Sequence, residues 1–116
     1  MTILAAWARA FLLTQLVEVP VYLVAQRAFP RGWAARFLVA TLASTFTHPL
    51  VWWVMLGPLR PLPWEVSLVI VEVGACVIEA IWLWRLGVGR ALGWAVAANG
   101  LSLGVGLGLR WLGVPV

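Results

Sequence analysis

The sequence predicts an all-α integral membrane protein, a four-helix transmembrane bundle with both termini on the same side. The chain of 116 residues is 64% hydrophobic and 10% charged, whereas a soluble domain is about half apolar and a quarter charged. Its apolar stretches are about 20 residues or longer, which is enough for a helix to cross the hydrocarbon of a bilayer. We therefore expect a single transmembrane domain over residues 1–116, with helices at about 3–28, 33–56, 64–85 and 91–112.

The first apolar segment is interrupted by polar residues that recur every three or four positions, namely Gln15, Glu18, Tyr22 and Gln26. This spacing places them along one face of a helix. A secretory signal would have an uninterrupted apolar centre and a small-residue cleavage site after it, so we interpret the segment as a retained helix. Pro20 removes a backbone hydrogen bond beside Glu18, so a bend is expected there.

The second segment follows a turn at residues 29–32, and it repeats the same polar spacing. Ser44 or Thr45 precedes His48 by four or three positions, which indicates another polar face. His48 is followed by Pro49, so this helix also combines an ionisable side chain with a proline. We expect His48 to face the interior of the bundle rather than the lipid.

The third segment carries two carboxylates within an apolar run, and it follows the proline-rich loop at residues 57–63. Glu72 and Glu79 are a heptad apart, so they lie on nearly the same face of a helix. A carboxylate within the hydrocarbon costs several kcal/mol unless it is paired, protonated or ligated. Glu65 instead lies in the first turn, where the helix dipole favours an acid, and it is expected to be structural.

The fourth segment contains Asn99 and Ser102, three residues apart, among small residues. Gly100, Gly104 and Gly108 recur every four positions. Small residues at this spacing allow another helix to approach closely, so we expect them to serve helix packing. Packing does not explain Asn99, which we expect to face the polar interior.

Counting 1.5 Å per residue from each segment's end predicts two polar layers. Glu18, Glu79 and Asn99 fall in one layer, while His48 and Glu72 fall in a second layer nearer the termini. The supporting polar residues on the same faces are Asn99, Ser102, Thr45 and Tyr22. A shift of two to four residues in a segment boundary, about 3 to 6 Å, would bring these layers closer together or move them further apart.

Carboxylate, imidazole and amide groups facing one interior predict a cation site. Glu18, His48, Glu72 and Glu79 form the expected metal or proton site. Carboxylate and imidazole ligands suit Zn, Mn or Fe, although the chain has no HxxxH, ExxH or CxxC spacing. Without a metal, neighbouring carboxylates share protons and suit a proton relay. Haem is disfavoured because the chain has one His.

Three functions remain open at this level. The first is cation binding, of a divalent metal or protons, for transport or an intramembrane reaction. The second is a structural or assembly subunit of a membrane complex, in which a hydrogen-bonded polar core only fixes the helix register. The third is a metal-dependent intramembrane hydrolase or lipid-modifying enzyme with His48 and Glu72 as a general base. Catalytic residues are not identified, since no serine or Cys76 lies in a recognisable nucleophile motif.

The expected partners are the lipid bilayer and other membrane chains. The bundle is narrow, so transport predicts a homo-oligomer or a partner membrane subunit, with the glycine-rich segment as the contact. No clustered basic and polar pattern indicates nucleic acid binding. Arginines at 27, 31, 36, 85 and 90 outnumber those at 9, 60 and 110. The positive-inside rule therefore predicts termini outside, in a prokaryotic-type inner or plasma membrane.

Overall fold

The computed structural model describes residues 2–115 as four α-helices joined by short loops. They are α1 (Ile3–Ala25), α2 (Trp33–Leu56), α3 (Trp64–Arg85) and α4 (Ala91–Trp111). The all-α fold is as predicted, and α1 ends at Ala25 rather than near residue 28. The predicted domain also includes residues 1 and 116, which lie outside the described residues.

The helix ends have local causes in the sequence. The hydroxyl of Thr2 accepts a hydrogen bond of 3.1 Å from the backbone N–H of Ala5 and so caps the start of α1. The end of α3 is a Schellman motif, in which the N–H of Val88 donates to the carbonyl of Leu83 at 2.9 Å. Gly87 has a φ of 87° in this motif, a backbone conformation that glycine adopts without strain.

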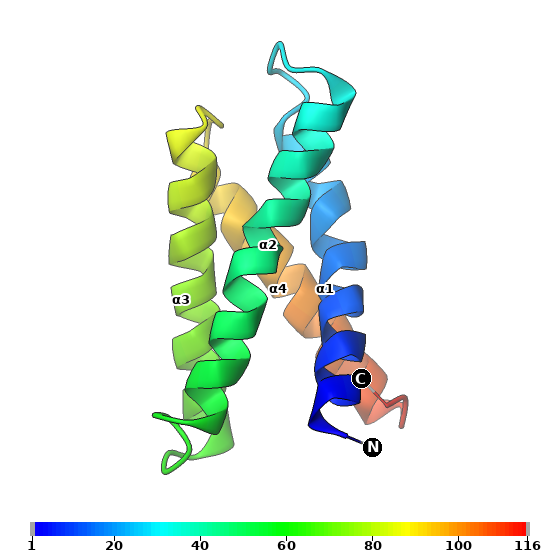
Figure 1. Ribbon diagram of the computed structural model, residues 1–116, viewed down its shortest axis with the longest axis vertical. Helices are drawn as coiled ribbons and strands as arrows, with labels where there is room; N and C mark the ends of the chain where they lie inside the picture. Colours follow the sequence, from blue (N-terminus) through cyan, green and yellow to red (C-terminus); the bar gives the residue numbers. More distant parts are fainter. Residues whose placement is uncertain (1, 116) are drawn as a thin grey trace.

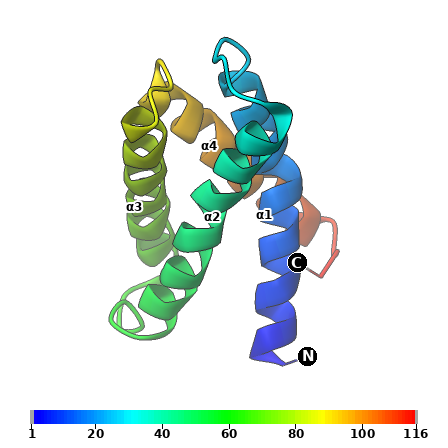
Figure 2. The same ribbon diagram turned by 45° about the horizontal axis from the view of Figure 1, so that its top comes forward.

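The helices form a ring in which each one packs on its neighbours in the order α1, α2, α3, α4 and back to α1. Figures 1 and 2 show α2 and α4 on opposite sides of the bundle, with α4 inclined across the back. Ile3 and Trp111 lie at the same end, which we call the terminal end (Figure 1). The loops before α2 and before α4 lie at the opposite end, which we call the loop end.

The outer surface of the bundle is apolar along the middle of its helices. Leu16 of α1 is 74% exposed and Val69 of α3 is 62% exposed, although both lie inside long helices. Each of the four helices is long and apolar enough to cross a membrane. Water disfavours such a surface and hydrocarbon accepts it, so the fold indicates a protein that resides in a membrane.

The buried apolar core is concentrated toward the loop end of the bundle. It consists of small and medium side chains from all four helices and the loop before α4: Val19, Tyr22, Ala25, Val39, Ala40, Ala43, Leu83, Val88, Ala91 and Ala98. Alanines at these positions let the helix backbones approach closely. This half of the bundle is therefore solidly packed.

Polar side chains reinforce the same end by binding backbone carbonyls. Gln26 is fully buried and donates to the carbonyl of Arg36 at 2.9 Å. The indole N–H of Trp82 donates to the carbonyl of Val39 at 3.1 Å, and the guanidinium of Arg31 donates to the carbonyl of Leu86. These bonds hold the start of α2 against α1 and α3 at the loop end. The bond from Arg31 also satisfies a carbonyl at the C-terminus of α3, where carbonyls lack intrahelical partners.

Replacing Ala98 by Leu is expected to destabilise the fold by about 1 to 3 kcal/mol, because the larger side chain has no space in the packed half. Ala98 is fully buried, whereas the adjacent Ala97 is exposed on the opposite face of α4. Ala97→Leu is therefore the matched control. Unfolding in mixed detergent micelles, followed by circular dichroism, measures both variants. Equal stability of the two would contradict the placement of the core.

Candidate functional site

A cavity of about 390 Å³ lies between the helices in the half of the bundle nearer the terminal end. Leu56, Trp64 and Arg110 line it, and these residues stand at the end of α2, the start of α3 and the end of α4. The cavity therefore opens toward the terminal end. At the other extreme it reaches Glu18 and Glu79, next to the packed core. We call this polar extreme the floor of the cavity.

Glu79 of α3 accepts hydrogen bonds from three side chains at the floor, and it is 1% exposed. Its Oε1 accepts from the phenol of Tyr22 at 2.5 Å and from the amide of Asn99 at 3.3 Å. Its Oε2 accepts from the hydroxyl of Thr47 at 2.9 Å. Since the three donors come from α1, α4 and α2, Glu79 connects all four helices at one point.

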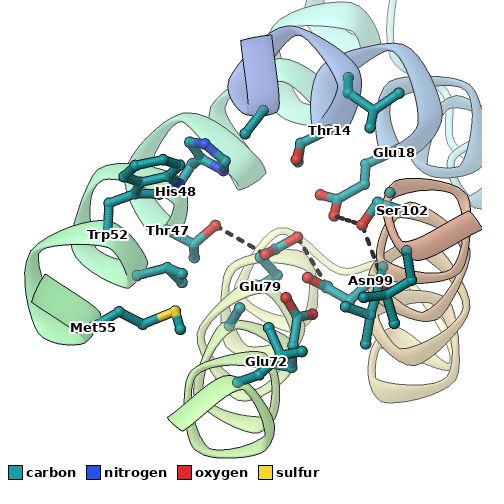
Figure 3. A pocket seen from close by; sticks show the side chains of 18 of the residues that line it. Thr14, Glu18, Thr47, His48, Trp52, Met55, Glu72, Glu79, Asn99 and Ser102 are labelled. Atoms are coloured by element: carbon teal, nitrogen blue, oxygen red, sulfur yellow. Dashed lines mark hydrogen bonds between the residues drawn. The ribbon is translucent and has the colours of Figure 1, made fainter. Parts of the chain in front are cut away.

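Glu18 of α1 is the second carboxyl group of the floor and is also 1% exposed. Its Oε1 accepts from the hydroxyl of Ser102 at 2.7 Å, and its Oε2 accepts from the hydroxyl of Ser44. Figure 3 shows Glu18 and Glu79 pointing toward each other from opposite helices.

The donors around the two carboxyl groups are all neutral. They are three aliphatic hydroxyls, a phenol and an amide, contributed by Ser44, Thr47, Ser102, Tyr22 and Asn99. The basic side chains that line the cavity are His48 and Arg110. Arg110 lies at the mouth, where its guanidinium is 5.2 Å from the ring centre of Trp64. The floor thus offers oxygen ligands and hydrogen-bond donors, and within residues 2–115 no positively charged side chain is bonded to it.

The structure brings together the predicted layer of Glu18, Glu79 and Asn99, and it adds Tyr22 and Ser102 to it. Sequence spacing put all of these residues on polar helix faces. Ser102, which was predicted as a supporting polar residue, bonds Glu18 directly.

The predicted pair of His48 and Glu72 lines the same cavity but is not joined by a hydrogen bond within residues 2–115. The imidazole packs among aromatic rings, with centroid distances of 5.8 Å to Trp7, 5.5 Å to Phe11 and 6.3 Å to Trp52. Its Nε2 is buried without a hydrogen-bond partner. Ser44 and Ser102 donate to Glu18, so no contact supports a serine activated by the imidazole.

Thr45 does not reach the carboxyl groups, so the polar face of α2 differs from the predicted one at this position. Its hydroxyl accepts from the amide of Gln15 at 3.1 Å, in a separate contact between α1 and α2. The floor is instead served by Ser44 and Thr47, which are three positions apart and share a face of α2. Thr47 went unrecognised because several hydroxyl residues follow one another in this segment.

The glycines Gly100, Gly104 and Gly108 do not make the predicted close helix contact within this chain. A Cβ added at any of them would meet nothing within 4 Å. Gly106 faces inward instead, where a Cβ would lie 3.8 Å from the side chain of Leu13. Contact of these three glycines with another chain stays a prediction.

Within residues 2–115 no three side chains among His, Cys, Asp and Glu converge closely enough to hold a metal ion together. A metal at the floor would therefore draw on the hydroxyl and amide oxygens in addition to Glu18 and Glu79. Comparison of the chain with known protein families, characterised proteins and solved structures finds no match. The function is accordingly inferred from the chemistry of the cavity.

Thr47→Val is expected to lower the free energy of unfolding by about 0.5 to 2 kcal/mol, because it removes a donor from the buried Glu79 at nearly constant volume. Thr41→Val is the control, since the hydroxyl of Thr41 donates only to the carbonyl of Phe37 in its own helix. Chemical unfolding in mixed micelles measures the difference. A larger loss for the control would argue against the floor as a stabilising network.

Proposed function

We propose that the protein binds a cation inside the membrane at Glu18 and Glu79, and exchanges it with the aqueous phase through the cavity during transport. The cation of the resting site is a proton shared by the two carboxyl groups. One observation carries this proposal. Two carboxyl groups, each 1% exposed, face one another at the floor of an open cavity, and every donor bonded to them in the described part of the chain is neutral.

Electrostatics supports a positive charge at this floor. Two ionised carboxylates that lie side by side in a low-dielectric interior repel one another, and burial deprives them of water. Neutral donors stabilise a single negative charge, but they do not neutralise two. A proton held between Glu18 and Glu79 removes one charge, and the five neutral donors then stabilise the other.

The shape of the cavity supports exchange from one side. The lining residues run from Trp64 and Arg110 at the terminal end to Glu18 and Glu79, and the packed core lies beyond them. The arginine distribution favours the loop end in the cytoplasm, so the cavity opens to the outside of an inner or plasma membrane. Transport then requires a second conformation in which the packed half opens. We expect a second copy of the chain or a partner subunit to stabilise that conformation.

Glu79→Gln is expected to abolish pH-driven proton flux into liposomes, because an amide accepts no proton at neutral pH. The infrared band of protonated carboxylic acids is expected to weaken in the same variant. Glu65→Gln is the matched control, since Glu65 is exposed in the first turn of α3. A pH-sensitive dye inside the liposomes reports the flux.

Retained flux in a folded Glu79→Gln variant would overturn the proton-binding proposal. It would favour a polar core that is only structural, in which Glu18→Gln and Glu79→Gln are tolerated because an amide has nearly the shape of a protonated carboxyl group. Circular dichroism of each variant establishes that it is folded before its flux is compared.

A divalent metal is the second candidate for the cation. The observation that favours it is that Glu18, His48, Glu72 and Glu79 all line one cavity. Carboxylate and imidazole ligands suit Zn, Mn or Fe. Such a site would require His48 and Glu72 to move toward the floor, because within the described range 2–115 no three His, Cys, Asp or Glu side chains converge closely enough to hold a metal.

If a metal binds, the purified protein contains it in stoichiometric amount, and adding Zn, Mn or Fe raises the unfolding temperature by linkage. Glu72→Gln and His48→Ala are expected to reduce that rise, and Glu65→Gln is expected to leave it unchanged. Elemental analysis and thermal unfolding measure these quantities. Absence of bound metal together with unchanged unfolding temperatures would remove the metal candidate.

A further inference from the structure

We infer that the cavity binds an apolar organic amine, with its ammonium group at Glu18 and Glu79 and its hydrocarbon body along the cavity walls. This inference rests on the proposed function, because it identifies the cation that replaces the shared proton. It is carried by the combination of an acidic floor, apolar walls and a cationic mouth in a single cavity.

The volume of the cavity favours a small organic ligand over a bare ion. Its volume of about 390 Å³ falls within the range of about 300 to 1,000 Å³ that is typical of pockets for small organic molecules. Along α3 the lining extends from Trp64 to Glu79, a rise of about 22 Å at 1.5 Å per residue. The cavity is thus long and suits an extended chain.

The walls between the mouth and the floor are predominantly apolar. They are formed by side chains from all four helices, including Leu13, Val51, Met55, Leu68, Leu103 and Leu107. Such walls favour hydrocarbon, at roughly 25 cal/mol per Å² of apolar surface removed from water. They offer few partners to a fully polar ligand, whose groups would remain unsatisfied.

The charges at the two extremes orient the ligand. Arg110 at the mouth repels an ammonium group, whereas Glu18 and Glu79 at the floor attract it. The guanidinium of Arg110 lies over the ring of Trp64, so its positive charge is held at the mouth. A fatty acid would meet the opposite arrangement, with its carboxylate repelled from the floor. The cavity therefore discriminates between the two by charge.

Binding is an exchange that conserves charge. The ligand arrives as an ammonium ion, forms hydrogen bonds to the carboxyl oxygens, and the proton held between Glu18 and Glu79 leaves to water. The other titratable or charged groups that line the cavity or contact the floor are Tyr22, His48, Glu72 and Arg110, and Cys76 of α3 lines a separate pocket with Glu72 and Asn99. One proton is released for each amine bound, and no covalent bond forms other than those to the transferred proton.

The test uses the full chain in nanodiscs of phosphatidylcholine and a decylamine that carries a diazirine on its terminal carbon. After illumination, mass spectrometry is expected to find the label on wall residues about 12 to 17 Å from the floor, such as Met55, Leu68 and Leu107, because an extended decyl chain is about 13 Å long. Unlabelled decylamine is expected to compete, and decanol or decanoate at the same concentration is not. A pH indicator in weak buffer reports the released proton.

Gly106→Leu and Gly104→Leu form a matched pair for this experiment. Gly106 lines the cavity, and an added side chain there contacts Leu13, whereas Gly104 is exposed with open space around it. Leucine also favours the helix more than glycine does, so both variants are expected to fold. Gly106→Leu should reduce the competed label at least about tenfold, and Gly104→Leu should leave it unchanged.

The outcomes distinguish this inference from the proposed function. If the infrared carboxylic acid band changes with pH in the wild type and Glu79→Gln abolishes flux, but decylamine neither competes nor releases protons, the amine inference fails alone. If Glu79→Gln leaves both the infrared band and the proton flux unchanged, the proposed function fails, and the amine inference, which rests on it, fails as well. Equal labelling of Gly106→Leu and Gly104→Leu would place the amine in the surrounding lipid and overturn the inference.

Discussion

The fold depends on one constraint, which is that two carboxyl groups, on α1 and α3, are buried in the interior of an apolar bundle and require donors from α1, α2 and α4. Glu79 accepts from α1, α2 and α4, and Glu18 accepts from α2 and α4. Lipid tails cannot replace any of these donors, so separating a helix leaves polar groups unsatisfied. Apolar surface gives little preference for one helix arrangement in a membrane, because lipid is equally apolar. The polar floor therefore fixes the register of the four helices.

This constraint also divides the bundle into two halves with different roles. Toward the loop end, alanines and backbone carbonyl contacts permit close packing, and Gln26 and Trp82 join neighbouring helices there. Toward the terminal end the helices enclose a cavity of about 390 Å³. The cavity lowers the stability of the fold because dispersion contacts are lost there. The packed half and the floor must offset that loss. Such a division is typical of proteins in which a rigid scaffold holds a binding site.

Much of this arrangement could be predicted from the sequence, because the length of an apolar segment and the spacing of its polar residues can be read within that segment alone. The helix count, the polar faces and the common depth of Glu18, Glu79 and Asn99 follow from them. The rotation of α2 does not, because Ser44, Thr45 and Thr47 occupy consecutive parts of one turn and an error of one residue rotates the face by about 100°. The environment of His48 also escaped prediction, since its aromatic neighbours Trp7 and Phe11 belong to another helix. The residue pattern of one helix does not show which residues of another helix it will contact.

The proposed exchange follows from the donors at the floor, none of which is basic among residues 2–115. If an arginine were bonded to Glu79, the carboxylate would be neutralised in every state, and a cation would gain little by entering. With neutral donors alone, the two carboxyl groups favour a bound positive charge at every stage of the proposed transport cycle. Release of one cation therefore favours uptake of another. A proton and an ammonium ion are then alternatives for one position rather than independent ligands. Coupling between them requires no second site and no long-range conformational signal, because both compete for the same oxygens of Glu18 and Glu79.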